Sequence, residues 1–272
     1  MPQSDLARAL APGTPDPWRA LAALSAALLV VMLLWAVSGD PRVVSGGPVW
    51  AKPMKFAASF LVLFATIALV ADRLSPPVRD GWPLRLIGLG MAVAMIAEMA
   101  WIVRQAARGA DSHYNSETPF EALMYTTVMA GGAVYLVIAI GLIGWIAKRD
   151  PGARFGPATR EGVWLGFVAS FVLTLVVAGW LSNGSGPYEG VHPPGGPTIP
   201  IMGWSGVTGD LRPAHFLALH AMQALPLLGL WLDRMGAAQG IRSVRLATGA
   251  WVAATALLFV QAVTGQPLIA LG

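Results

Sequence analysis

The sequence predicts an all-α membrane protein built as a bundle of about seven transmembrane helices. Of its 272 residues, 56% are hydrophobic and only 12% are charged, whereas soluble proteins average about 25% charged residues. Uncharged stretches such as 20–38 and 122–147 also approach or exceed the ~20 apolar residues that cross a hydrocarbon core. The lipid bilayer is therefore the expected partner of this chain, and nucleic acid is not.

Hydropathy places the helices along the chain, and chemical signals mark where several of them begin. An Asp-Pro pair at 16–17 precedes the first helix, and Thr-Pro-Phe-Glu at 118–121 forms a capping box before the fourth. Gly162 and Gly166 predict a close approach of a neighbouring helix to the fifth. The predicted spans are residues 20–38, 54–72, 84–106, 120–147, 162–182, 213–233 and 247–266.

The chain is expected to form one transmembrane domain, 20–272, after a mobile N-terminal tail at 1–19. With the N-terminus inside, the predicted inner segments carry twice as many Lys and Arg as the outer segments. Because loops rich in Lys and Arg stay on the cytoplasmic side, the N-terminus is expected inside and the C-terminus outside. The long Gly/Pro-rich outer loop at 183–212 is expected to fold back as a lid.

Polar and charged side chains, which are unfavourable in hydrocarbon, lie in one half of the predicted bundle. A charged group inside the hydrocarbon costs ~2.5 to 3.5 kcal/mol, so each one indicates a functional site. All four histidines lie on the predicted outer side, and we expect these groups to enclose a common cavity. The candidate ligands of a metal ion or haem are His215, His220, His113 and Glu98.

Two further sets of residues complete the predicted site. Haem b or a copper, zinc or iron ion would need imidazole or carboxylate ligands, supporting hydrogen bonds, and cations for any anionic group. Because the chain has no cysteine, covalent c-type haem and iron–sulfur clusters are excluded. The supporting residues are Gln223, Gln105, Gln261, Tyr125 and Asp210, and the anion-binding residues are Lys52, Lys55 and Arg212.

Three functions remain open. The leading hypothesis is an outward-facing His/Glu site that binds haem b or a metal ion for redox chemistry or metal handling, with quinol or a periplasmic redox protein as partner. The first alternative is a carrier or binding protein for a small anionic or lipophilic solute, with Lys55, Arg212 and the long loop as its gate. The second is a helical subunit of a larger membrane complex. Whether the protein is an enzyme is not predicted, and no catalytic residue is assigned.

Four sequence blocks resemble an uncharacterised group of polytopic bacterial membrane proteins. The resemblance is spread over most of the chain, and it implies a setting in the bacterial inner (plasma) membrane without implying an activity. The blocks are Trp-Ala-Lys-Pro-Met-Lys-Phe at 50–56, Ser-His-Tyr-Asn at 112–115, Gly-Asp-Leu-Arg-Pro-Ala-His-Phe at 209–216 and His-Ala-Met-Gln-Ala-Leu-Pro at 220–226.

Two hydrolase resemblances are weaker. Gly-Trp-Ser-Gly at 203–206 resembles the Gly-x-Ser-Gly of rhomboid intramembrane proteases, which would make Ser205 a nucleophile in need of a histidine base. In rhomboids that serine opens a transmembrane helix, whereas Ser205 falls in the long loop. Seven-helix zinc hydrolases carry a late His-x-x-x-His pair, from which the spacing of His215 and His220 departs.

Overall fold

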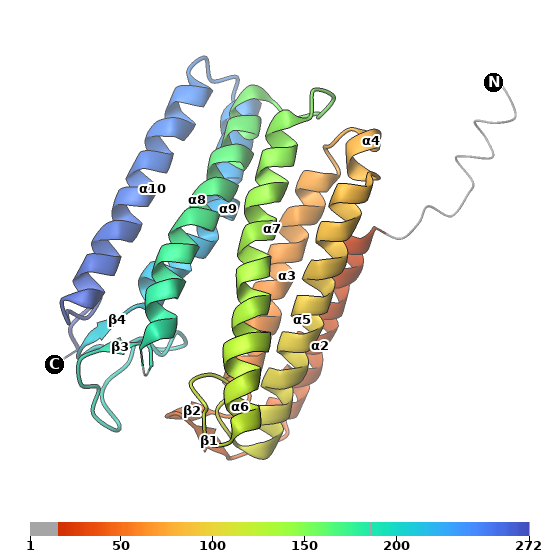
Figure 1. The fold of residues 1–272 in the computed structure, drawn as a ribbon. Coiled ribbons are helices and arrows are strands. Elements are labelled where there is room, and N and C mark those ends of the chain that lie inside the picture. The colour runs from red at the N-terminus through yellow and green to blue at the C-terminus, as the bar shows by residue number, and fades with distance from the viewer. Residues whose placement is uncertain (1–15, 185, 272) are drawn as a thin grey trace, which may run out of the picture.

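Seven helices of the computed structural model are long and apolar enough to cross a membrane, within the described residues 16–184 and 186–271. They lie side by side in one bundle (Figure 1), which confirms the predicted fold class. The spans are α2 (Pro17–Val37), α3 (Ala51–Ala71), α5 (Trp82–Arg108), the segment Pro119–Arg149, α8 (Pro157–Asn183), α9 (Arg212–Arg234) and α10 (Gly240–Val263).

The fourth span is not a uniform α-helix. Its short first helix α6 (Pro119–Leu123) is followed by a π-helical segment, η1 (Met124–Met129), and then by α7 (Ala130–Arg149). The remaining short elements are α4 (Pro76–Arg79) and two antiparallel hairpins, β1 (Val43–Val44) with β2 (Gly47–Pro48) and β3 (Tyr188–Glu189) with β4 (Gly209–Asp210).

Several boundaries differ from the expected ones, and α8 begins at Pro157 instead of residue 162. Residues 1–15 of the predicted tail lie outside the described residues, and α2 already begins at Pro17. Helix α10 begins at Gly240 instead of residue 247, because Arg242 and Arg245 lower the hydropathy of its first two turns without interrupting the helix.

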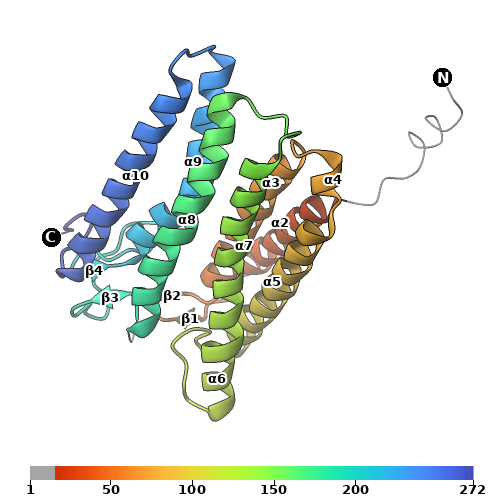
Figure 2. The ribbon, with the colours of Figure 1, turned by 45° about the horizontal axis from the view of Figure 1, so that its top comes forward.

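The bundle has two chemically different ends. Both hairpins, α6 and the 184–211 loop gather at one end, which we call the loop end, while α4 and the turns before α8 and α10 lie at the opposite end (Figures 1 and 2). Helix α2 starts at the opposite end and the chain finishes at the loop end. The two ends of the helical domain therefore lie on opposite sides, as an odd number of spans requires.

The helix starts and stops follow from local chemistry. Asp16 caps α2 by accepting a hydrogen bond from the Trp18 amide at 3.0 Å. Thr118 accepts a hydrogen bond from the Glu121 amide at 3.2 Å and donates its hydroxyl to the Glu121 carboxylate at 3.1 Å. This confirms Thr118 as the N-cap, while the Glu121 carboxylate bonds to the Thr118 hydroxyl and not to its amide as in a full capping box. Helix α5 ends at Gly109, whose φ of 68° is readily adopted only by glycine.

Helix α7 joins two packed groups of helices. On one side α2, α3 and α5 pack around buried Phe64, Met91 and Met95. On the other side α8, α9 and α10 pack together, and a Cβ atom on Gly166 of α8 would come within 2.7 Å of the Ala221 carbonyl oxygen of α9. The predicted close approach at the glycines of α8 is therefore confirmed.

Apolar side chains cover the outside of the bundle. Leu34 of α2, Val93 and Ile96 of α5 and Leu257 of α10 are all more than half exposed, where a soluble protein would place polar residues. In a bilayer these side chains contact lipid tails at no cost. The protein is thus a multi-pass membrane protein in contact with the lipid bilayer.

Candidate functional site

The predicted polar residues do share one half of the bundle. Helices α3 and α9 begin at the loop end, α5 and α10 finish there, and η1 follows α6 at the same end (Figure 1). Gln223 lies near the middle of α9. The residues placed in this half are Lys52, Lys55, Glu98, Gln105, His113, Tyr125, Asp210, Arg212, His215, His220 and Gln261.

Two charged side chains in this half, Lys52 of α3 and Glu98 of α5, form no ion pair with each other. Glu98 is only 6% exposed and Lys52 is half-buried. The Lys52 nitrogen and the Glu98 carboxylate oxygens do not come within 4.0 Å of each other. Within the described part of the chain neither side chain has a hydrogen-bond partner. A second carboxylate near Lys52, that of Asp111, already accepts a hydrogen bond from the Ser45 hydroxyl.

Aromatic rings lie on the Lys52 side, where Phe56 follows one helical turn after Lys52 on α3. The His113 ring lies 5.5 Å from Phe56 of α3 and 5.8 Å from Tyr125 of η1, measured between ring centroids. Burial, and after it the positive charge of Lys52, together lower the pKa of His113 to about 3. His113 is therefore a neutral imidazole at physiological pH. We call Lys52, Glu98, Phe56, His113 and Tyr125 the charged site.

The loop that carries His113 is held rigidly. The Trp101 indole donates a hydrogen bond to the Ser112 carbonyl at 2.9 Å, and the Gln105 amide donates to the Asp111 carbonyl at 3.1 Å. Tyr114 adopts a φ of 57° and donates its hydroxyl to the Leu181 carbonyl of α8 at 2.9 Å. Such a backbone conformation is uncommon for a residue with a side chain and persists only where the surroundings fix it.

The π-helical segment η1 forms one wall of the charged site. It spans Met124–Met129 and places Tyr125 against both His113 and Tyr114. π-helical turns are rare and occur frequently at functional sites. Nothing in the sequence pattern distinguished these residues from the α-helix around them.

The long loop closes over the loop end of α3 and α9. Its inner part, 197–206, is a tight hairpin in which Thr198 pairs with Ser205, and we call this segment the lid hairpin. Lys55 of α3 donates a hydrogen bond to the Met202 carbonyl at 2.9 Å, and Arg212 of α9 donates to the Gly203 carbonyl at 2.7 Å. Two helices from different groups thus hold adjacent carbonyls of one hairpin.

The three predicted anion-binding cations do not converge. Arg212 forms an ion pair with Asp210 at 2.6 Å, in which the Asp210 side chain is fully buried. Lys55 binds a lid carbonyl, and Lys52 belongs to the charged site. Arg212 and Lys55 therefore hold the loop in place, because their donors already have acceptors within the protein.

Ser205 is a structural residue of the loop. His192 and Ser205 do lie together, with 2.9 Å between the imidazole Nδ1 and the hydroxyl oxygen. Ser205 is fully buried, however, and its oxygen accepts hydrogen bonds from the amides of Val207 and Thr208. A nucleophile needs a free lone pair and access to substrate. The arrangement therefore does not fit the rhomboid-like role.

The two α9 histidines have different surroundings. His220 lies within hydrogen-bond distance of the Gln223 side-chain oxygen at 3.2 Å, and Gln223 donates to Thr66 of α3 at 3.2 Å. The Nδ1 atom of His215 is buried and, within the described residues, has no hydrogen-bond partner. Neither imidazole hydrogen-bonds to Glu98.

The four predicted metal or haem ligands are not gathered in one place. No group of three or more His, Asp or Glu side chains among the described residues is arranged to hold a metal ion. Glu98 and His113 belong to the charged site, while His215 and His220 lie on α9. The haem or metal hypothesis stays a prediction, and it now depends on the α9 histidines.

Most of the predicted supporting residues stabilise local structure. Gln105 holds the 111–115 loop, as described above, and also lies 3.4 Å from the Glu121 carboxylate. Gln261 donates to the Pro267 carbonyl at 2.7 Å and so holds the C-terminal segment. Asp210 accepts a hydrogen bond from the Ser205 amide. Tyr125 and Gln223 alone are placed beside candidate ligand-binding groups.

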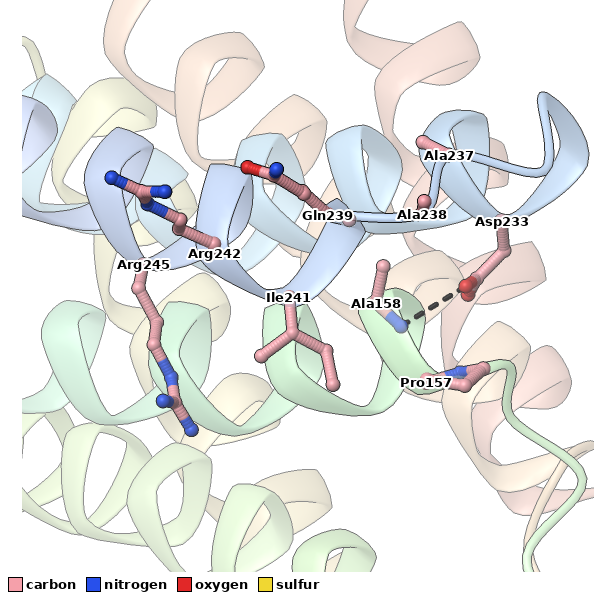
Figure 3. A pocket seen from close by; sticks show the side chains of 10 residues that line it. Pro157, Ala158, Asp233, Ala237, Ala238, Gln239, Ile241, Arg242 and Arg245 are labelled. Atoms are coloured by element: carbon pink, nitrogen blue, oxygen red, sulfur yellow. Dashed lines mark hydrogen bonds between the residues drawn. The ribbon is translucent and has the colours of Figure 1, made fainter.

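A surface pocket lies away from this chemistry. It measures about 460 Å³ at the opposite end of the bundle and is lined in part by Asp233, Arg242 and Arg245 (Figure 3). The Asp233 carboxylate accepts hydrogen bonds from the first amides of α8, including that of Ala158 at 3.0 Å, and Arg245 pairs with Glu161 at 2.7 Å. The pocket is a depression between helix ends whose charged groups are largely used internally.

Comparison with known proteins yields no match among protein-family models, curated proteins or solved structures. The resemblance of the four sequence blocks to bacterial polytopic proteins therefore stays a prediction. The site has to be interpreted from its own geometry.

Besides Phe56, sequence reasoning missed three contributors to the site. Tyr114 and Trp101 hold the loop that carries His113, and Thr66 completes the hydrogen bonds around His220. Tyr114 stood inside the Ser-His-Tyr-Asn block, which could have drawn attention to it. Trp101 and Thr66 gave no signal, because tryptophan and threonine are common in membrane helices without any such role.

Proposed function

We propose that the protein binds a small solute in the charged site, reached from the loop end, and acts as a carrier or binding protein in the bacterial inner membrane. The observation that supports this proposal is that buried Glu98 and half-buried Lys52 carry opposite charges and have no hydrogen-bond or ion-pair partner among the described residues. The lid hairpin, held by Lys55 and Arg212, is the gate over this end of the bundle.

The physical argument rests on the cost of buried charge. A charged group in a low-dielectric interior is destabilising by several kcal/mol unless it is paired and hydrogen-bonded. Structural pairs such as Lys148 with Glu161 make direct contact, here at 2.8 Å. Lys52 and Glu98 make no such contact with each other, and a polar solute that contacts them would offset the cost of burying their charges.

Only the tip of the lid hairpin suits a gate, because its base is fixed by bonds such as that from the Ser205 amide to the Asp210 carboxylate at 2.8 Å. The tip residue Ile201 is 93% exposed, and the hydrogen bond from Lys55 to the Met202 carbonyl ties the tip to α3. Gates are drawn from such weakly held segments, since they must open without unfolding the domain.

Substituted-cysteine labelling tests the proposal, because the chain has no cysteine of its own. We expect Glu98→Cys to react with a water-soluble, membrane-impermeant methanethiosulfonate reagent added on the side of the loop end. Two positions on the same helix serve as controls: Met95→Cys lies in the core and Val93→Cys faces lipid, so both should stay unreactive. If position 98 reacts as slowly as both controls, the charged site is closed to water and the proposal is wrong.

One observation favours a second candidate function, ligation of haem or a metal ion by His220. The Thr66 hydroxyl donates to the Val62 carbonyl, Thr66 accepts from the Gln223 amide, and the Gln223 oxygen accepts from Nδ1 of His220. This directed chain leaves Nε2 of His220 with a free lone pair, which is the state of a metal-ligating imidazole.

A visible absorption spectrum and a metal analysis of the purified protein test this second candidate. A Soret band or a stoichiometric metal that is lost in His220→Ala, but kept in His192→Ala, would support it. A protein with neither signal, or with unchanged occupancy in His220→Ala, would exclude ligation by His220.

A further inference from the structure

We infer that the tip of the lid hairpin, residues 200–203, is an anchor that inserts into the lipid bilayer at the loop end. Its partner is the acyl-chain region of the adjacent leaflet, just below the headgroups. The inference goes beyond the proposed function, because it needs no solute in the charged site. It follows from the composition of the tip, from the helix faces that hold it and from the exposure of Ile201.

The tip has a composition that lipid tolerates. Residues 190–209 include no Asp, Glu, Lys or Arg, and the tip itself reads Pro-Ile-Met-Gly. The amides of Met202 and Gly203 donate hydrogen bonds to carbonyls within the hairpin, at 2.7 and 2.8 Å, and their own carbonyls accept from Lys55 and Arg212. Unpaired backbone groups are what keeps loops out of lipid, so these bonds lower the cost of bringing the tip to the bilayer.

On α3 the tip is tied to a face that lipid contacts. Lys55, which donates to the Met202 carbonyl at 2.9 Å, is exposed, and so are Val62 and Leu69. These three residues follow one another every two helical turns, so they lie on one face of α3. Because the apolar residues of this face contact lipid tails, the tip lies at the lipid side of α3.

On α9 the hairpin contacts a face of the same kind. The ring of Trp204, which follows the tip, lies 5.8 Å from the ring of Phe216, measured between centroids. Phe216 and Leu227 are separated by three helical turns and both are exposed, so they share one apolar face of α9. The hairpin therefore continues the lipid-facing surfaces of two helices.

The length of α3 sets the depth of the tip. Helix α3 has 21 residues, which span about 31 Å at 1.5 Å per residue, and the hydrocarbon core is about 30 Å thick. Both ends of α3 therefore lie near the edges of the hydrocarbon. Lys55 is in the first turns of α3, so the Met202 carbonyl that it binds, and the adjacent Ile201, lie at the boundary between headgroups and acyl chains.

Ile201 projects from the hairpin in an unfavourable conformation. Its side chain is 93% exposed, and its φ of 66° is one that β-branched residues rarely adopt. In water the exposed side chain would add the cost of hydrating an apolar surface. Contact with acyl chains removes that second cost, which gives a physical reason for an isoleucine at the apex of the tip.

Spin labelling of the full chain in phosphatidylcholine vesicles tests the inference, because the chain has no cysteine of its own. A nitroxide on Ile201→Cys should collide more often with oxygen, which concentrates in lipid, than with a water-soluble nickel chelate. Leu34→Cys on α2 is the lipid-facing control, and Ser116→Cys in the exposed loop before α6 is the water-facing control. The ratio of oxygen to nickel collisions at position 201 should match that at position 34 and exceed that at position 116.

Two results of this measurement would overturn the inference. A ratio at position 201 equal to that at position 116 would place the tip in water. Low collision rates with both reagents would show that protein, and not lipid, covers the tip.

A second variant tests whether Ile201 itself is the anchor. Asparagine tolerates a positive φ better than isoleucine does, so Ile201→Asn removes the apolar side chain without adding backbone strain. A nitroxide on Thr198→Cys, an exposed position at the base of the hairpin, should become more mobile in vesicles when Ile201→Asn is added. Unchanged or lower mobility would show that Ile201 does not hold the hairpin to lipid and would overturn the inference.

Discussion

Replacing Gly166 with alanine should loosen the contact between α8 and α9. The added Cβ would lie 2.7 Å from the Ala221 carbonyl oxygen and 3.0 Å from Cδ of Pro226. The first contact is with backbone, so α9 must shift as a whole, and overpacking of this kind costs about 1–3 kcal/mol. Alanine also gains roughly 0.5–1 kcal/mol over glycine in a helix, which leaves a net loss of about 1–2 kcal/mol.

Gly249 of α10 is the matched control, because a Cβ atom there meets nothing within 4 Å. Gly249→Ala should keep the helix-propensity gain without the clash, so the two variants should differ by about 1–3 kcal/mol. Equilibrium unfolding in mixed detergent micelles, followed by circular dichroism, measures both free energies. Equal free energies of unfolding for the two variants would refute the close packing of α8 on α9.

Three further predictions concern the site and its loop. Because the pKa of His113 is about 3 in the folded protein and about 6.5 for a free histidine, only the unfolded chain binds this proton between those values; stability should fall as pH drops through that window. His113→Asn should flatten this dependence in unfolding titrations, and an equal slope in both proteins would contradict the assigned burial. Lys55→Met removes one hydrogen bond from the lid hairpin, a net ~0.5–1.5 kcal/mol, so Glu98→Cys should be labelled about two- to tenfold faster in that background; an unchanged rate would show that the hairpin does not gate the site. Ser205→Ala leaves two loop amides unsatisfied and should speed proteolytic cleavage within 190–206 about fivefold or more, whereas Val191→Ala, at an exposed position, should not; equal cleavage rates would argue against the structural role of Ser205.

The fold could be predicted from the sequence because hydropathy and helix caps are local properties. Each span is long enough to be recognised alone, and the capping box at 118–121 marked the start of α6 within one residue. The π-helical turn at Met124–Met129 could not be predicted, because its backbone depends on the packing of Tyr125 against the 111–115 loop.

The sequence could predict which half of the bundle holds the site residues, but not which of these residues lie together. Glu98 was expected to join His215 and His220, since all three lie in the loop-end half. Hydropathy gives the depth of a residue and not the order of helices around the bundle. In the structure α9 packs with α8 and α10, whereas α5 packs with α3 and α7, so Glu98 belongs to a different group of helices from the two α9 histidines.

The roles of the cationic side chains were the hardest to predict. Lys52, Lys55 and Arg212 have the same charge and similar depth, yet one lies unpaired in the charged site and two hold the loop. Their different roles depend on the lid hairpin, which lies far from Lys55 in sequence and next to it in space.

The most direct test of the central claim is a cryo-electron-microscopy map of the protein in a lipid nanodisc at a resolution that shows side chains. We predict density for a non-protein species between Lys52 and Glu98, within hydrogen-bond distance of both. A direct ion pair between the two side chains with no density between them, or a Glu98 side chain directed at lipid, would contradict the account.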